Sequence, residues 1–293
     1  MQYDVIIIGG SYAGLSAAMQ LGRARRSVLV LDAGERRNRF AQHSHGFLTR
    51  DGTDAAEIAA IGRAQVMRYP TVTFRDAQVT AAHVGPPITV TLASGETLAT
   101  ARLILATGVR DELPDIEGLA ERWGKHVFHC PYCHGYELDQ GPIGVLATSP
   151  MSSHHGLMLP DWGPTTYFTR GLFEPDADTL ASFARRGTAI DRTPVTRISG
   201  AADVELADGR TLSFAGLFVA SMLRQGPLTA QLGLAVEELP FGALIKTDAM
   251  KATSVPGIFA AGDNAAMGNV AFAVADGARA AVSAHASLIF AAH

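Results

Sequence analysis

The sequence predicts an α/β protein of two three-layer domains, each with a mainly parallel sheet between helices. Three observations support this prediction. Residues 5–32 contain a strand, a glycine turn, a helix and a second strand; apolar strands followed by tight turns recur at 103–108 and 257–263; and another apolar strand lies at 143–146, in the middle of the chain. Such alternation is typical of βαβ units. A chain of 293 residues is long enough for two domains with their own cores.

The N-terminal segment carries the first motif. The β-branched run Val5-Ile6-Ile7-Ile8 leads into Gly9-Gly10-Ser11-Tyr12-Ala13-Gly14. A helix pattern over residues 15–21 follows, and a second strand over 28–31 ends on Asp32. A glycine turn between strand and helix, with an acid about 20 residues further on, is the fingerprint of a dinucleotide-binding unit.

Each part of this fingerprint has a physical role. Gly9 makes the tight turn, Gly14 lets helix and strand pack closely, and Asp32 accepts hydrogen bonds from ribose hydroxyls. The helix N-terminus meets the pyrophosphate. Ser11 departs from the pattern, because it stands where a middle glycine normally lets the backbone approach the phosphates; its hydroxyl is a substitute donor. On this motif alone, an ordinary strand-to-helix turn remains the alternative.

The rest of the first domain is predicted from periodicity and turn residues. A polar stretch over 36–54 precedes a helix over 55–69, then strands over 71–79 and 88–92. Ser94-Gly95-Glu96 indicates a hairpin turn. The strand that enters Ala106-Thr107-Gly108, the strand that enters Gly262-Asp263, and a helix from Val270 to Ile289 complete the pattern.

Both cysteines of the chain lie in one hexapeptide, His129-Cys130-Pro131-Tyr132-Cys133-His134. Cys-X-X-Cys spacing lets two sulfurs form and break a disulfide by thiol exchange, and neighbouring imidazoles lower a thiol's pKa or carry its proton. Half of a zinc site is a second interpretation, although His129 and His134 lie too close in sequence to complete a tetrahedron easily. A buried structural pair is a third.

The composition of the chain limits the classes of partner that we expect. A net charge of −4 with 18% charged residues, and no basic run, argues against nucleic acid and acidic membrane surfaces as partners. No apolar stretch reaches the roughly 20 residues that span a bilayer. The start, Met1-Gln2-Tyr3-Asp4, lacks the basic region of a signal peptide. With no other cysteines for structural bridges, we expect a cytoplasmic protein that acts on small molecules or protein thiols.

Together these motifs resemble the flavoprotein disulfide reductases, and over nearly the whole chain the low-molecular-weight thioredoxin reductases. Leu217-Phe218-Val219-Ala220 and Thr253-Ser254-Val255-Pro256-Gly257 match that family in order and spacing. The resemblance implies two Rossmann-like domains and a homodimer. Residues 1–113 and 244–293 would form a discontinuous FAD-binding domain, and residues 114–243 an NAD(P)H-like domain that carries the dithiol.

The resemblance also implies site residues. His43 and His45 of the polar stretch either face the flavin or are solvated loop histidines. We expect the following residues to bind FAD: Gly9, Ser11, Gly14, Asp32, His45, Val79, Ala106, Thr107, Gly108, Gly262, Asp263 and Val270.

The second domain departs from the family. Ala147, Ser149 and Ser152 stand where a glycine fingerprint for NADPH is expected, Pro150 removes an amide donor, and the expected basic cluster is reduced to Arg170. We infer a nicotinamide domain that keeps its fold and has lost its site. This loss resembles the dithiol oxidases of the gliotoxin and holomycin type, as does His134 after the second cysteine, where thioredoxin reductases carry an acid. An altered turn that still accepts NAD(P)H is the alternative.

The sequence therefore predicts an FAD-dependent oxidoreductase that oxidises a dithiol, as a small molecule or a protein thiol, with oxygen as acceptor. The resemblance places Cys130 as the sulfur that a substrate thiolate attacks and Cys133 as the flavin-side sulfur. His134 is the expected general base, since an ordinary imidazole pKa of about 6.5 suits proton transfer at neutral pH, and His129 is the reserve. An NAD(P)H-dependent disulfide reductase, and a flavin and dithiol redox sensor without turnover, are the alternatives.

Overall fold

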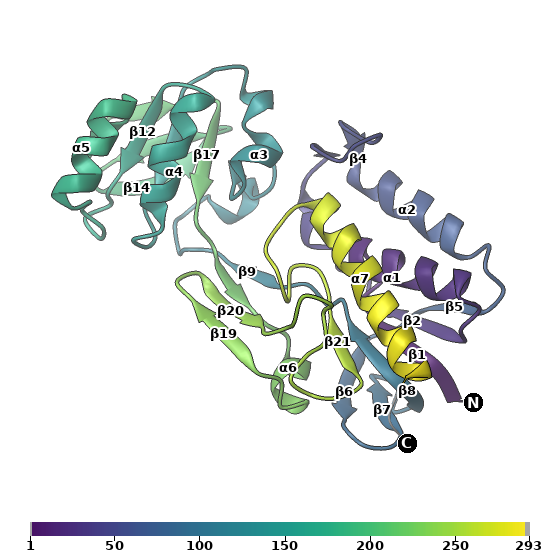
Figure 1. Cartoon of the computed structure of the whole chain (residues 1–293). Coiled ribbons are helices and arrows are strands. Elements are labelled where there is room, and N and C mark those ends of the chain that lie inside the picture. Colours follow the sequence, from purple (N-terminus) through teal and green to yellow (C-terminus); the bar gives the residue numbers. More distant parts are fainter. Residues whose placement is uncertain (1, 291–293) are drawn as a thin grey trace. The chain divides into compact units, whose positions relative to one another are not determined.

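The computed structural model describes residues 2–290, which form two compact units (Figure 1). Unit 1 contains the chain up to Arg39, Gly46–Arg110 and the chain from Arg224 onward, whereas unit 2 contains Phe40–His45 and Asp111–Leu223. The chain crosses between the units in β9 (Arg110–Glu112) and β18 (Met222–Arg224). Both units combine helices with parallel strands, so the predicted α/β class is confirmed.

The return to unit 1 lies twenty residues before the position expected from the sequence, at 224 instead of 244. Helix α6 (Pro227–Gln231) and the residues after it explain the difference. Leu228, Leu232 and Leu234 are buried in a core cluster of unit 1. The Gln225 side-chain amide donates to backbone carbonyls of the same unit, at 2.9 and 2.8 Å. This segment, which begins at the turn dipeptide Gly226-Pro227, therefore packs with the first unit.

A seven-stranded sheet forms the centre of unit 1. Its order is β5-β2-β1-β8-β7-β6, with β21 paired to β8 as well. The strands β5, β2, β1, β8 and β21 pair in parallel, whereas β7 pairs antiparallel with both β6 and β8. The strands are β1 (Gln2–Ile8), β2 (Val28–Asp32), β5 (Val72–Asp76), β6 (Val79–His83), β7 (Ile88–Leu92), β8 (Thr97–Leu105) and β21 (Ile258–Ala260). Shorter strands of unit 1 are β4 (Thr53–Asp54), β19 (Val236–Leu239) and β20 (Gly242–Ile245), whereas β3 (His43–Ser44) belongs to unit 2.

The single strand expected over 71–79 was wrong. Strand β5 ends at Asp76 and β6 begins at Val79, because the two pair with different neighbours. Strand β5 runs parallel to β2, and the Ala77 amide that follows it donates to the carbonyl of Asp32 at 2.8 Å. Strand β6 then turns back along β7. The alternation of apolar and polar residues changes phase at Arg75-Asp76, where two polar residues follow one another, and the prediction of one strand over 71–79 overlooked this change.

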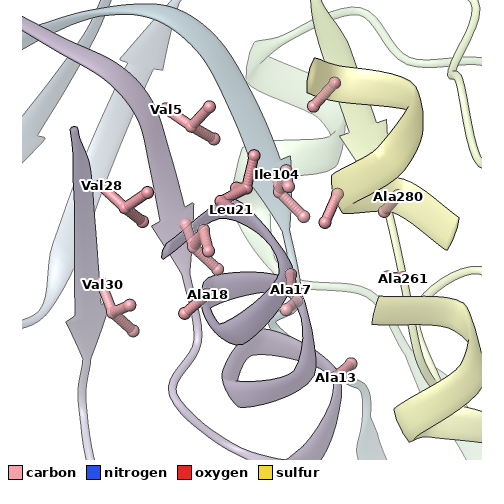
Figure 2. Close-up of a cluster of buried hydrophobic side chains, with 14 of the residues drawn as sticks. Val5, Ala13, Ala17, Ala18, Leu21, Val28, Val30, Ile104, Ala261 and Ala280 are labelled. Atoms are coloured by element: carbon pink, nitrogen blue, oxygen red, sulfur yellow. The ribbon is translucent and has the colours of Figure 1, made fainter. Parts of the chain in front are cut away.

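Apolar side chains cover both faces of this sheet. Alternate residues of β1 point to opposite faces, so Val5 and Ile7 join one core cluster and Ile6 and Ile8 the other. Figure 2 shows the first cluster, where α1 (Tyr12–Arg23) packs over the sheet. Helices α2 (Ala55–Val66) and α7 (Val270–Ile289) also contribute to unit 1. Burial on both faces is what a three-layer α/β unit requires.

Small residues allow α1 and α7 to approach closely. A Cβ on Gly277 would lie 2.0 Å from the carbonyl oxygen of Ala13. Ala17, Ala280 and Ala284 are fully buried between the helices and the sheet. Alanine-rich composition in α7 therefore reflects packing inside unit 1. Within residues 2–290, no helix combines the length and apolar character needed to cross a membrane.

Unit 2 contains a five-stranded parallel sheet of order β10-β17-β11-β12-β13 and a three-stranded antiparallel sheet, β14-β15-β16. Its α-helices are short, and α5 is capped by the Asp176 side chain, which accepts from the Thr179 amide at 2.8 Å. The elements are β10 (Val127–Phe128), β11 (Ile143–Leu146), β12 (Thr165–Phe168), β13 (Ala189–Asp191), β14 (Val195–Ser199), β15 (Asp203–Leu206), β16 (Thr211–Ser213), β17 (Gly216–Val219), α3 (Pro131–His134), α4 (Ser152–Met158) and α5 (Ala177–Arg186).

Candidate active site

The turn after β1 forms a cradle of bare backbone in unit 1. Gly9 has a φ of +105°, and a Cβ there would lie 2.1 Å from the carbonyl oxygen of Ala106. A Cβ on Gly14 would lie 1.8 Å from the carbonyl oxygen of Gly9. The Ala106 amide donates to the Ile8 carbonyl at 2.8 Å, which holds the end of β8 beside the turn. Glycine is therefore required at both predicted positions.

Asp32 lies at the end of β2, and its Oδ1 accepts a hydrogen bond from the Gly10 amide at 3.1 Å. A Cβ on Gly10 would lie 2.7 Å from the Cβ of Asp32, so this second glycine is also needed. The acid predicted to contact a ribose thus also fixes the turn. Ser11 is the N-cap residue of α1 and makes no side-chain capping bond; its role as a phosphate donor stays a prediction.

Polar groups from the ends of β8 and β21 meet near the same turn. Gly108 and Gly262 both have positive φ, at +61° and +81°. The Asn264 side-chain amide donates to the Leu105 carbonyl at 3.1 Å and to Thr107 Oγ1 at 3.2 Å. Asn264 was not predicted from the sequence, because an amide two residues beyond Gly262 has no fixed role without the contact to Thr107.

Asp263 and Arg37 form a second unpredicted pair. Arg37 Nη1 lies 2.9 Å from Asp263 Oδ2, and both side chains are mostly buried. Arg37 follows Asp32 by five residues, inside the stretch that the sequence marked only as polar. The other two cofactor residues predicted in unit 1 lie at element starts: Val79 begins β6 and Val270 begins α7. Their contact with a cofactor stays a prediction.

These residues fit a dinucleotide. Among the described residues, Arg36 Nε, Asn38 Oδ1 and Asn264 Oδ1 are buried with no hydrogen-bond partner. Asn38 is held next to α1 by a 3.0 Å bond to the Tyr12 hydroxyl, and Asn264 next to Thr107. Buried polar groups normally have partners, so unsatisfied atoms around an open glycine turn indicate that a ligand supplies them. FAD carries the pyrophosphate and ribose hydroxyls that such a turn binds.

Replacing Asp32 tests this half of the site. Asp32→Ala removes both the acceptor for ribose hydroxyls and the bond to the Gly10 amide, so we expect FAD affinity to fall at least about tenfold. Asp32→Asn keeps an oxygen acceptor for Gly10 and should lose less. Dialysis followed by titration with FAD, read by flavin fluorescence, gives both constants. Equal affinity in the wild type and Asp32→Ala would place the nucleotide elsewhere.

The two cysteines form a disulfide in unit 2. Cys130 caps the short helix α3, whose first residue, Pro131, is buried. The Cys133 amide donates to the Cys130 carbonyl at 3.2 Å, and the Gly135 amide to the Pro131 carbonyl at 2.7 Å. Within the described residues, no three His, Cys, Asp or Glu side chains gather as metal ligands, so the zinc interpretation has no support.

His134 is buried against an aromatic ring. Its imidazole stacks on Phe128 with centroids 4.3 Å apart, and neither ring nitrogen has a hydrogen-bond partner among the described residues. Burial, together with the positive charge that His45 carries when protonated, lowers the pKa of His134 to about 4. The ordinary imidazole pKa assumed from the sequence was therefore wrong. His134 is neutral at pH 7, which is the form that a base requires.

The other predicted histidines have different surroundings. His129 stacks on Trp123 with centroids 5.9 Å apart. His45 lies in the part of the polar stretch that belongs to unit 2, where its Nδ1 is 3.1 Å from Glu137 Oε1. His45 is therefore paired with a carboxylate three residues beyond His134. Its predicted contact with FAD stays a prediction.

The loop after β11 is closed by its own side chains. Ser152 Oγ accepts from the Thr148 amide at 2.9 Å and from the Ser149 amide at 3.3 Å, and Ser152 is fully buried. Arg170 Nη1 donates to the Ala147 carbonyl at 3.2 Å. Backbone amides in this loop are the donors that a Rossmann unit offers to a pyrophosphate. In this chain the Ser152 hydroxyl, at a position where the fingerprint has a glycine, accepts hydrogen bonds from two of these amides.

Acid should destabilise unit 2. His155 is buried in α4, and burial lowers its pKa, like that of His134, to about 4. A histidine in the unfolded chain titrates near pH 6.5. The stability of unit 2 is therefore undiminished above pH 6.5, and part of it is lost as the pH falls towards 4, because the unfolded chain then binds protons that the buried rings do not. The loss is on the order of 2–3 kcal/mol for each ring. In His155→Gln, the loss of stability on acidification should be about half that of the wild type. His83→Gln, which replaces an exposed histidine, should lose as much stability as the wild type.

Tryptophan fluorescence measures this loss in urea at pH 7.5 and 4.5, because both tryptophans, Trp123 and Trp162, lie in unit 2. An unfolding midpoint for unit 2 that stays constant across this range would contradict the burial of neutral imidazoles.

Comparison with known proteins identifies the family. A family model described as pyridine nucleotide-disulphide oxidoreductase matches residues 3–149. The chain belongs to this family. It is 35% identical to thioredoxin reductase tcpT of Claviceps purpurea, across 90% of this chain and 87% of that protein. It is 33% identical to thioredoxin reductase sirT of Leptosphaeria maculans, across 94% and 91%.

Solved structures agree with this family. An oxidoreductase from Agrobacterium tumefaciens is 58% identical, with a TM-score of 0.97 and 99% of both chains covered. A structure described as HlmI is 36% identical, with a TM-score of 0.92, covering 98% of this chain and 93% of that one. The chain is therefore a thioredoxin reductase-like thiol–disulfide oxidoreductase, as predicted, and FAD is the cofactor expected for its family.

Proposed function

We propose that this enzyme oxidises a dithiol to a disulfide and uses molecular oxygen, not a nicotinamide nucleotide, as its electron partner. The observation that carries the proposal is the loop after β11, where Ser152 Oγ occupies the amides of Thr148 and Ser149. A cofactor pyrophosphate would have to displace these bonds to the fully buried Ser152 side chain. The Cys130–Cys133 disulfide of the same unit is closed and needs only a thiol partner.

The cysteine pair carries out the exchange. A substrate thiolate attacks Sγ of Cys130, the Cys130–Cys133 bond breaks, and Cys133 leaves as a thiolate. The second substrate thiol then attacks the mixed disulfide and releases Cys130, so the substrate has lost two electrons and two protons. The chemistry that FAD supplies when bound is acceptance of two electrons from the reduced cysteine pair. One molecule of oxygen takes up both electrons and both protons as hydrogen peroxide.

Chain residues divide the remaining work. The turn of Gly9 and Gly14, with Asp32, would hold the nucleotide part of FAD. His134 directly follows Cys133 and stays the proposed general base; its pKa of about 4 keeps the ring neutral at pH 7 and also makes it a weaker base than an ordinary imidazole. The proposed setting is the cytoplasm, and a homodimer is the proposed assembly.

A second candidate is an NAD(P)H-dependent disulfide reductase. The parallel sheet of unit 2 retains the architecture of a nucleotide-binding domain, and the curated relatives are named thioredoxin reductases. A third is a redox sensor, in which the disulfide opens and closes without turnover. Neither accounts for the occupied amides after β11.

Oxygen stoichiometry tests the proposal. With a small dithiol such as dithiothreitol in air-saturated buffer, we expect one oxygen consumed and one hydrogen peroxide formed for each disulfide produced. A monothiol of similar pKa is the matched control and should react more slowly, since it cannot resolve its own mixed disulfide intramolecularly. Oxygen uptake driven by NADPH at a comparable rate would overturn the proposal.

A further inference from the structure

The helix that follows the closed loop reaches the peptide that carries the disulfide. His155 of α4 is buried, with 7% of its surface exposed. Its Nε2 lies 2.9 Å from the carbonyl oxygen of His129. His129 immediately precedes Cys130, so its carbonyl belongs to the peptide group whose nitrogen is that of Cys130. All of these residues lie in unit 2.

The surroundings of His155 define its tautomer. A backbone carbonyl only accepts, so the ring must carry its hydrogen on Nε2 for this bond to exist. Nδ1 is buried and has no partner among the described residues, so it needs no hydrogen. Burial also lowers the pKa of the ring, which is therefore neutral at pH 7. A neutral imidazole in one tautomer is a fixed, single-direction donor.

A row of rings connects the two ends of the disulfide peptide. His155 contacts Phe218 with centroids 5.9 Å apart, Phe218 contacts Phe128 at 5.8 Å, and Phe128 stacks on His134 at 4.3 Å. One end of this row thus holds the residue before Cys130, and the other end is the residue after Cys133. Aromatic pairs at these separations are mutually attractive, so the row restrains the peptide at both cysteines.

We infer that His155 is a positioning residue for Cys130: its hydrogen bond to the His129 carbonyl holds the peptide in the arrangement that brings the two sulfurs to bonding distance. This inference rests on the proposed function only because it takes Cys130 and Cys133 as the reacting pair. The helix that would begin at a nucleotide site in an intact nicotinamide domain serves the dithiol instead.

The disulfide equilibrium tests this role. The holoenzyme is equilibrated anaerobically with mixtures of reduced and oxidised dithiothreitol, and the cysteines are then counted by alkylation and mass spectrometry. In this exchange the protein disulfide gains two electrons and two protons from dithiothreitol, whose own disulfide forms. His155→Phe keeps a ring of similar shape but no donor, so the equilibrium constant for reduction should rise roughly three- to tenfold.

Conservative variants separate positioning from general damage. His155→Gln places an amide N–H at about the reach of imidazole Nε2, and should stay within about twofold of the wild type. The neighbouring His154 is exposed, and His154→Phe should leave the constant unchanged. A wild-type constant in His155→Phe, or equal shifts in His155→Phe and His155→Gln, would overturn the inference.

A second measurement needs no variant. Nitrogen-correlated NMR of the histidine side chains should show His155 as the Nε2–H tautomer at pH 7, and an Nδ1–H tautomer would overturn the assignment. Both experiments read cysteines or imidazoles without oxygen or nicotinamide. They therefore fail or succeed independently of the electron partner in the proposed function.

Discussion

Turnover with a dithiol should fall by at least about a thousandfold in Cys130→Ser and in Cys133→Ser. A hydroxyl cannot form the mixed disulfide or close the redox ring, so either substitution removes the covalent route entirely. The effect should appear in kcat, while FAD binding is retained because the glycine turn lies in unit 1 and the cysteines in unit 2. Oxygen uptake measures the first quantity, and flavin absorbance after gel filtration the second.

Trapping distinguishes the two sulfurs. With an activated aryl disulfide, Cys133→Ser should form a stable mixed disulfide at Cys130, whereas Cys130→Ser should react more slowly, because the flavin-side sulfur is the less accessible one in the proposed mechanism. The double variant, in which both cysteines are replaced by serine, has no thiol and gives the background labelling. Faster labelling of Cys130→Ser would exchange the two roles, and turnover above a tenth of the wild type in either single variant would contradict disulfide chemistry altogether.

The glycine turn of the candidate site could be predicted from the local sequence. The roles of Gly9 and Gly14 follow from a turn between strand and helix, and the structure places a backbone carbonyl within 2.1 Å of where each Cβ would be. The end of β2 at Asp32 was likewise predictable, because an apolar run ended on an acid at the right distance. These features depend on neighbours close in sequence.

Long-range contacts were not predictable in the same way. Asn264 contacts Thr107 across 157 positions, and His155 contacts His129 across 26. Neither pair leaves a periodic signal. Helix α6 and the residues after it join unit 1 through Leu228, Leu232 and Leu234, which share a core cluster with residues of strands more than a hundred positions earlier, so the boundary at 244 was placed too late.

Side-chain environment was also hidden from the sequence. A histidine after Cys133 indicates a base, but only the stacking on Phe128 shows that burial lowers the pKa of His134 to about 4. Ser152 is the converse case. The sequence shows a serine that replaces a glycine, whereas the structure shows that its hydroxyl occupies the amides of Thr148 and Ser149.

The occupied loop makes a large and direct prediction about the electron donor. Anaerobic stopped-flow mixing of the FAD-loaded enzyme compares excess NADPH or NADH with excess dithiothreitol, and flavin absorbance is recorded. Because Ser152 takes the amide donors and Arg170 bonds to Ala147, nicotinamide nucleotides should leave the flavin oxidised for minutes. The dithiol should bleach it, and air should then restore the colour and yield peroxide. Rapid bleaching by micromolar NADPH would contradict the account and make the enzyme a nicotinamide-dependent reductase.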